Sequence, residues 1–283
     1  MTEMVHMGTA NGLDAKELKR MADKIRMHVI EMTFEAGSGH PGGSLSAAEL
    51  FSVLYFKVLR HDPEDPEWPG RDKFVLSKGH VAPALYAALA ESGYFPVEEL
   101  LTLRKLGSRL QGHPARGKLP GIEVSTGSLG QGLSMACGLS LAAKLDKKDT
   151  RVYCLMGDGE LQSGQNWEAM MLASHYKLNN LTIFVDRNRL QIMGKTEDTL
   201  SIEPLEAKLK AFGFRTMTID GHNVKQIIKA CERTSSSPTA VIMNTVKGKG
   251  VSFMENNPDF HGRSCKPDER DRALKEIKER SSW

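Results

Sequence analysis

The chain has 283 residues, of which 40% are hydrophobic and 26% are charged, and its formal net charge at pH 7 is +3. The low net charge and the even spread of Gly and Pro exclude a low-complexity disordered chain, and the length suits one large domain or two small ones. No apolar run approaches the roughly 20 residues of a membrane-spanning helix, and no basic stripe indicates nucleic-acid binding. The start also lacks the apolar core of a signal peptide, so we expect a cytoplasmic protein without membrane or nucleic-acid partners.

The four cysteines are widely separated in the sequence. None belongs to a CxxC pair, so neither a zinc site nor a disulfide framework is expected, and buried free thiols are predicted instead. They are Cys137, Cys154, Cys231 and Cys265.

The first part of the chain predicts helices on either side of a glycine-rich loop. Apolar residues at helical spacing predict a helix over residues 18–34, after a polar tail at residues 1–14. Beyond the loop, Ser46 and Glu49 show the S-x-x-E spacing of a capping box, which predicts a helix that continues to about Leu59.

From residue 73 onward, strands and helices alternate. A short buried strand at residues 73–76 precedes an alanine-rich helix, and a second capping box at Ser128 and Gln131 predicts a helix over residues 132–145. The later elements are strand 151–156, helix 166–176, strands 181–185 and 214–219, helix 224–233, strand 240–246 and a charged helical tail within residues 263–283. This alternation predicts a single α/β domain, with a mainly parallel sheet covered by helices on both faces.

Polar residues and glycines follow four of the predicted strands directly. They are Ser77-Lys78-Gly79-His80, Gly157-Asp158-Gly159, Asp186-Arg187-Asn188 and Asp220-Gly221-His222. Ligands of open α/β sheets bind at the carboxyl ends of the strands, so we expect these loops to face one cavity. Carboxylate, amide and carbonyl oxygens suit magnesium, so Asp158 and Asn188 predict a magnesium-diphosphate site. Alternatively, Gly-Asp-Gly is a surface turn and Asn188 only caps the next segment.

Five histidines lie beside or near glycines, which leave room for an imidazole and a ligand together. They are His40, His80, His113, His222 and His261. Five such loops favour a binding site, whereas one alone would indicate nothing. Gly248-Lys249-Gly250 lacks the full P-loop pattern, and no G-x-G-x-x-G opens a first βα turn, which disfavours a nicotinamide enzyme.

Gly157-Asp158-Gly159 with Asn188 resembles the thiamine diphosphate motif, which begins with GDG and ends in Asn. Five further runs resemble transketolase in the family's order: SGHPGG at 38–43, SKGH at 77–80, GHP at 112–114, TGSLGQG at 126–132 and DGH at 220–222. The resemblance extends from about residue 18 to 262 and covers only the family's amino-terminal portion. It implies a thiamine diphosphate-binding domain over residues 15–262, in the first subunit of a split, two-chain transketolase.

The resemblance also implies a role for each matching residue. The side chains of Asp158 and Asn188 and the carbonyl of Leu190 would hold a divalent ion, magnesium or calcium. His40 and His113 would bind sugar hydroxyls as catalytic residues. The other residues implied to contact the cofactor are His80, Gly127, Leu129, Gly157, Gly159, Ile192, which would pack on the thiazolium, and His261, which would also assist proton transfer.

The activity implied is transfer of a two-carbon ketol unit from a ketose to an aldose, with sugar phosphates as substrates. The glutamate that activates the cofactor in the family belongs to the pyrimidine-binding domain, which is absent from this sequence. We therefore expect a partner chain with the pyrimidine-binding and C-terminal domains, in an α2β2 heterotetramer. The family usually has two glutamates after GDG that couple paired sites; Ser163 replaces the first, and Glu168 matches the second.

Other functions remain as alternatives. The α subunit of a 2-oxo acid dehydrogenase also contains GDG, but that family lacks the SGHPGG and SKGH loops. A magnesium-dependent phosphate hydrolase would need an aspartate nucleophile motif, which we do not find. A non-catalytic regulatory homologue is harder to reconcile with the intact metal and histidine positions.

Overall fold

A five-stranded parallel sheet forms the centre of the computed structural model, which describes residues 12–232 and 235–281. The strand order is β1-β2-β3-β7-β6, and every neighbouring pair is parallel. The strands are β1 (Lys73–Leu76), β2 (Val152–Gly157), β3 (Leu181–Arg187), β6 (Arg215–Asp220) and β7 (Thr239–Asn244). A separate antiparallel hairpin consists of β4 (Leu190–Gln191) and β5 (Gly194–Lys195). The predicted α/β class and the five predicted strands are confirmed.

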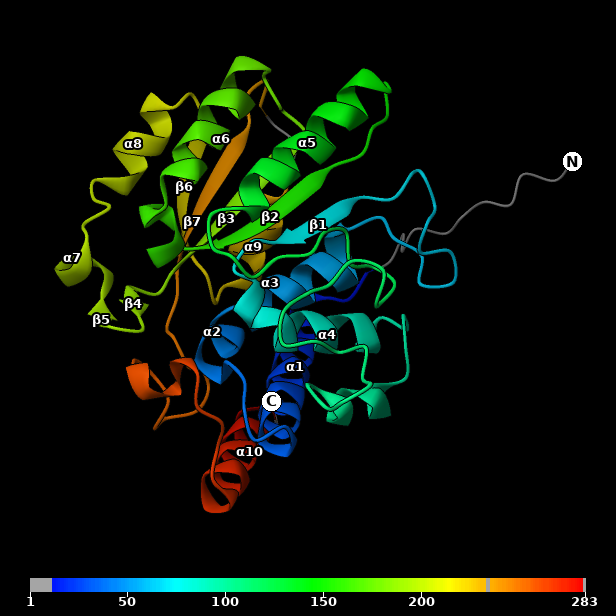
Figure 1. Cartoon of the computed structure of the whole chain (residues 1–283), viewed down its shortest axis with the longest axis vertical. Coiled ribbons are helices and arrows are strands. Elements are labelled where there is room, and N and C mark those ends of the chain that lie inside the picture. Colours follow the sequence, from blue (N-terminus) through cyan, green and yellow to red (C-terminus); the bar gives the residue numbers. More distant parts are fainter. Residues whose placement is uncertain (1–11, 233–234, 282–283) are drawn as a thin grey trace, which may run out of the picture.

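Helices cover both faces of the sheet (Figure 1), and each face has its own hydrophobic core. On one face lie α1 (Ala15–Glu35), α2 (Pro41–Ser46), α3 (Ala48–Val53), α4 (Ala82–Glu91), α9 (Val224–Ala230) and α10 (Pro267–Ser281). On the other lie α5 (Gly132–Leu145), α6 (Gly164–His175) and α8 (Leu205–Ala211). Strand β2 is buried on both faces because successive side chains alternate: Tyr153 and Leu155 enter the first core, and Cys154 and Met156 the second. The edge strand β6 has only half-buried and exposed residues.

The long helix α1, near the start of the chain, packs against α10, the last helix. Asp14 is its N-cap and forms a capping box with Glu17, which satisfies backbone N–H groups of the first turn. Helix α10 packs along α1 and buries Ala273 and Ile277 completely. The charged helix predicted at the C-terminus therefore exists and belongs to the packing of the domain. Most of the predicted N-terminal polar tail lies outside the described residues.

Both capping boxes predicted inside the chain are wrong. Ser46 is the last residue of α2, a helix that begins at Pro41, and its hydroxyl donates to Asp186 at 2.6 Å. Glu49 instead accepts from the buried guanidinium of Arg26 at 2.6 Å. Helix α5 begins at Gly132 without a side-chain cap, so Ser128 has no capping role there. For Ser46 and Glu49, tertiary hydrogen bonds thus replace the local ones that the spacing suggests.

The remaining short elements are α7 (Thr196–Thr199), a π-helical turn at Leu54–Val58, and 3₁₀ turns at Gly79–Val81, Val97–Thr102, Gly159–Gln162 and Pro258–His261. All four cysteines are buried and free, as predicted. In the part of the chain that the structure describes, no helix is both long and apolar enough to cross a bilayer.

Candidate functional site

The candidate site lies where β1, β2 and β3 end. Parallel pairing sets Gly157 beside Asp186, so the segments that follow β2 and β3 emerge next to each other. The segment after β7 joins them, because the N–H of Gly248 donates to the carbonyl of Gly42 at 2.9 Å and so holds this loop against α2. The ends of four strands, β1, β2, β3 and β7, and the start of α2 therefore converge at the carboxyl end of the sheet.

Four histidines from four separate segments form one cluster. The ring centre of His40 lies 5.2 Å from that of His80, 6.2 Å from that of His113 and 5.5 Å from that of His261. His80 and His261 are 5.3 Å apart. The Nδ1 atom of His40 is buried and has no hydrogen-bond partner among the described residues. The cluster therefore contains at least one polar atom that a ligand can satisfy.

The four imidazoles are neutral at pH 7. Burial, followed by the charge of Arg104, lowers the pKa of His40 to about 4, and burial and Lys247 lower that of His261 to about 3. Burial and Lys78 hold the pKa of His80 well below its usual range, and burial also lowers that of His113. A neutral imidazole has one N–H donor and one acceptor nitrogen, so each ring can both donate and accept at a ligand.

Two buried lysines lie beside the histidines. The ammonium of Lys78 pairs with Asp186, and both side chains are almost completely buried. The ammonium of Lys247 donates to His261 Nδ1 at 2.8 Å and to the carbonyl of Leu190 at 3.1 Å, and burial and the charge of Lys78 lower its pKa to about 8. The carboxyl end of the sheet, where these two lysines lie, is therefore suited to an anion.

Asp158 and the segment after β3 are in direct contact. Asp158 is only 2% exposed, and its Oδ2 accepts the N–H of Arg189 at 2.5 Å and the guanidinium of Arg187 at 3.3 Å. Burial and the nearby carboxylate of Asp186 raise the pKa of Asp158. Asn188 is also buried, and its Oδ1 accepts the N–H of Leu190 at 3.1 Å.

These oxygens fit a divalent cation. A carboxylate, an amide oxygen and a backbone carbonyl are the hard ligands that magnesium and calcium prefer. The Leu190 carbonyl already accepts a cationic ammonium, and burial and Asp186 raise the pKa of Asp158 although Arg187 pairs with it, so a further cation would stabilise its charged form. Among the described residues, no group of three or more His, Cys, Asp or Glu side chains could hold a metal, so Asn188 and the carbonyl would be essential ligands.

The remaining predicted residues lie on loops around this centre. A Cβ on Gly127 would come within 3.3 Å of the His113 ring, and one on Gly159 within 2.8 Å of the Gln191 side chain, so both glycines allow close packing. Leu129 and Ile192 are 43% and 69% exposed, although both are apolar. The described part of the chain therefore leaves these two side chains largely uncovered.

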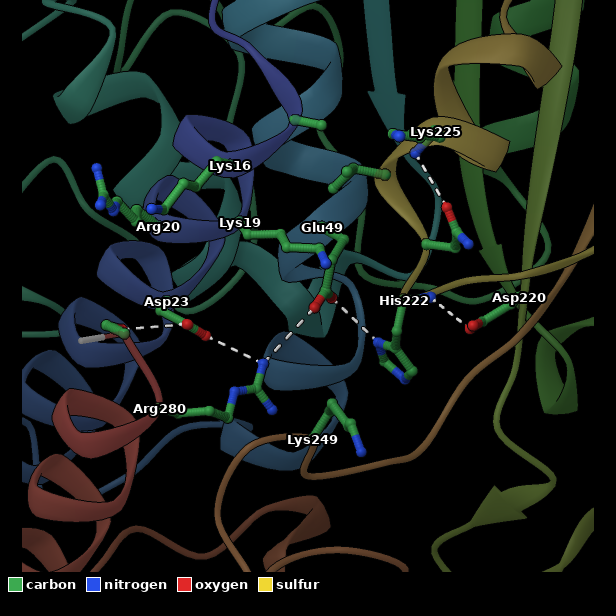
Figure 2. A pocket seen from close by; sticks show the side chains of 14 residues that line it. Lys16, Lys19, Arg20, Asp23, Glu49, Asp220, His222, Lys225, Lys249 and Arg280 are labelled. Atoms are coloured by element: carbon green, nitrogen blue, oxygen red, sulfur yellow. Dashed lines mark hydrogen bonds and ion pairs between the residues drawn. The ribbon is translucent and has the colours of Figure 1, made fainter. Parts of the chain in front are cut away.

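The loop after β6 does not join the site, so the prediction that four strand-end loops face one cavity is wrong for Asp220-Gly221-His222. The Nδ1 atom of His222 lies 3.1 Å from Glu49, and its Nε2 accepts the N–H of Val246 at 2.9 Å. Strand β6 is at the edge of the sheet, and His222 lines a separate pocket between α1, α9 and α10 (Figure 2).

Several polar residues of the site were not singled out from the sequence. Glu160 accepts the N–H groups of Gly130 at 2.9 Å and Gly157 at 3.0 Å, and also the Ser77 hydroxyl, which ties the loops together. Lys247 could have been found from its position, because it follows the end of β7 as the other loops follow their strands.

Comparisons with known proteins identify a family. Residues 17–282 match the family model "Transketolase, thiamine diphosphate binding domain". The 6-deoxy-6-sulfo-D-fructose transketolase subunit SqwG of Clostridium sp. (strain MSTE9) is 46% identical over 248 residues, 87% of this chain and 90% of that protein. An apulose-4-phosphate transketolase subunit of Actinobacillus succinogenes is 42% identical over 270 residues, 94% of this chain and 98% of that protein.

A solved structure supports the same family. The transketolase of Campylobacter jejuni superposes with a TM-score of 0.89 at 33% identity, over 96% of this chain. The superposition covers only 43% of the Campylobacter chain. This chain therefore spans less than half of that transketolase but nearly the full length of the two subunit relatives.

Proposed function

Because the chain belongs to the transketolase family, through its thiamine diphosphate-binding domain, we propose that it is the N-terminal subunit of a two-chain transketolase. The complete enzyme would transfer a two-carbon ketol unit from a ketose donor to an aldose acceptor. The observation that carries this proposal is the convergence of Asp158, Asn188 and four neutral histidines at one edge of a parallel sheet, in a chain as long as the subunit relatives.

The residues at the strand ends would hold the cofactor. In this proposal Asp158, Asn188 and the Leu190 carbonyl bind magnesium or calcium, and this ion and His80 bind the diphosphate of thiamine diphosphate. The backbone at Gly127, Leu129, Gly157 and Gly159 and the side chains of Ile192 and His261 complete the contacts. When bound, the cofactor supplies the electron sink that carbon–carbon cleavage and formation require.

The histidines would bind the sugar and move protons. Lys247 is an ammonium donor to Nδ1 of His261, which leaves the proton of the neutral ring on Nε2. His261 can therefore pass its Nε2 proton to a sugar oxygen only as Nδ1 takes a proton from the Lys247 ammonium, and the reverse transfer restores both groups. His40 and His113 would bind the hydroxyls of the donor, and the unpartnered Nδ1 of His40 supports such a contact.

A partner chain would complete the site. The exposed Leu129 and Ile192 lie on the loops around the cofactor position, as expected for side chains that another molecule covers. On the opposite side from α1, Met171 of α6 is 57% exposed, Tyr176 just after α6 is 48% exposed, and Leu145 of α5 is 74% exposed. We include an α2β2 assembly, sugar-phosphate substrates, the pentose phosphate pathway and a cytoplasmic location in the proposal.

Reconstitution tests this function. The chain alone, given thiamine diphosphate, magnesium, xylulose 5-phosphate and ribose 5-phosphate, should show no turnover. Addition of a C-terminal transketolase subunit encoded beside it should restore turnover. Appreciable turnover by the chain alone would refute the two-chain proposal, and cofactor binding without turnover by the complete pair would indicate a regulatory homologue.

A further inference from the structure

A second pocket, distinct from the candidate site, lies between α1, α9, the loop after β7 and α10 (Figure 2). Its volume is about 880 Å³, which is in the range of sites that hold small organic ligands. None of the clustered histidines, nor Asp158 or Asn188, lines it. The pocket therefore needs an explanation of its own.

Basic side chains dominate the lining. Six of the lining residues are Lys or Arg and three are Asp or Glu. The basic ones are Lys16, Lys19, Arg20, Lys225, Lys249 and Arg280. Figure 2 shows them entering from different sides: the first three from α1, Lys225 from the start of α9, and the last two from the loop after β7 and from α10.

Two of the three acidic residues of the pocket already pair with arginines in its walls, and the third, Asp220, accepts the backbone N–H of His222 at 2.9 Å. Glu49 pairs with the fully buried Arg26 at 2.6 Å and lies 3.1 Å from His222. Asp23 pairs with Arg26 at 2.9 Å and with Arg280 at 3.1 Å. Since Arg26 lies behind the wall and adds another positive charge, the carboxylates do not neutralise the lining.

Three lysines are left without a salt bridge to any residue that the structure describes: Lys16, Lys19 and Lys225. They lie on two elements, α1 and α9, that face the same hollow. Like charges gathered in a concave site repel one another and focus a positive potential. A bound anion with several charges would remove this repulsion.

From this geometry we infer that the pocket binds a small metabolite carrying two or more phosphate groups. Its size exceeds what one phosphate fills, and its cations lie on opposing walls, so separate phosphates can be bound at the same time. A nucleic acid would instead need an extended basic stripe, and the net charge of the whole chain is only +3. Such a ligand would link α1, α9 and α10 and so stabilise the packing of the chain ends.

Calorimetric titration of the full chain with tripolyphosphate, in metal-free buffer at low ionic strength, tests the inference. Three variants are compared with the wild type. Lys19→Gln/Lys225→Gln removes two cations of the pocket. Lys229→Gln/Lys278→Gln removes two exposed lysines outside it, and His80→Ala alters the candidate active site, where polyphosphate could also bind.

We expect one tripolyphosphate per chain, with at least tenfold weaker binding in the pocket variant and binding within twofold of wild type in the other two. Tripolyphosphate should also raise the thermal unfolding midpoint of all but the pocket variant. Equal binding by the pocket and control variants, or orthophosphate binding as tight as tripolyphosphate, would overturn the inference. Loss of binding in His80→Ala would also overturn it, by assigning the anion to the active site.

Discussion

Substitution of Lys78 by methionine should strongly destabilise the protein. Lys78 is 2% exposed and Asp186 is fully buried, and their side chains form an ion pair at the end of β3. Methionine keeps the apolar stem of the lysine but removes its charge, which leaves the Asp186 carboxylate buried without a cation. Removal of one partner of a buried pair costs about 3–5 kcal/mol. The hydroxyls of Ser46 and Thr245 still donate to Asp186, so we expect about 3 kcal/mol.

The size of this effect should depend on pH. Burial raises the pKa of Asp186, but the charge and hydrogen bond of Lys78, with the two hydroxyls, outweigh burial and lower it below 3.8. Without Lys78, burial dominates and the pKa rises above its unfolded value. A raised native pKa contributes stability below the unfolded pKa and loses it as the pH rises through the native pKa, so the deficit of Lys78→Met grows with pH.

Urea unfolding of both proteins at pH 5 and pH 8, followed by circular dichroism, measures the deficit. Lys229→Met, at an exposed position, is the matched control and should change stability by no more than about 0.5 kcal/mol. Adding Asp186→Asn to Lys78→Met removes the unpaired charge and should recover part of the loss. A loss of stability below about 1 kcal/mol at pH 8, or an equal loss at pH 5 and pH 8, would refute the reasoning.

Three further predictions concern other sites. Arg26 and His222 outweigh burial and lower the pKa of Glu49 from 4.5 to about 2. This group should therefore stabilise the fold above pH 4.5, and about 3 kcal/mol of that stability should be lost as the pH falls to 2. In Glu49→Gln, the free energy of unfolding measured in urea should vary less with pH across this range. Gly248→Ala should cost about 1–3 kcal/mol, measured by thermal unfolding, because Gly248 has φ +81° and its Cβ would meet the Met254 carbonyl. Asp158→Ala should abolish thiamine diphosphate binding to the reconstituted pair in calorimetry, and unchanged affinity would remove this residue from the metal site.

The sequence predicted the parts of the fold that depend on local patterns. Strands β1, β2, β3 and β7 appear as short, mostly apolar runs, which buried strands of parallel sheets require, so they were recognisable. The edge strand β6 instead alternates polar and apolar residues and is half-exposed. The capping boxes failed for the opposite reason. Ser46 has the spacing of a cap, but its hydroxyl donates to Asp186, which is 140 residues away in the sequence. A rule based on neighbouring residues cannot identify a partner so distant in the sequence.

Strand order limited the prediction of the site in the same way. His80 and His222 both follow predicted strands and both adjoin glycine, so the sequence alone does not separate them. In the order β1-β2-β3-β7-β6, β1 and β6 are opposite edge strands: β1 lies beside β2, whereas β3 and β7 separate β6 from β2, and only His80 reaches the other histidines. The order of strands depends on the packing of the whole chain, which local patterns do not specify.

The neutral histidines and the buried lysines are connected physically. Burial first, and then the charges of Lys78 and Lys247, lower the pKa of His80 and His261, because an imidazolium beside a buried ammonium is unfavourable. The same lysines make this edge of the sheet attractive to a diphosphate. In the proposed function, the same two residues would thus supply charge for an anionic cofactor and favour the neutral rings that would exchange protons with a sugar. An acidic group placed here instead would raise the histidine pKa values and repel the diphosphate. The acid that activates the cofactor is therefore better supplied from outside this cluster, as the proposed partner chain would do.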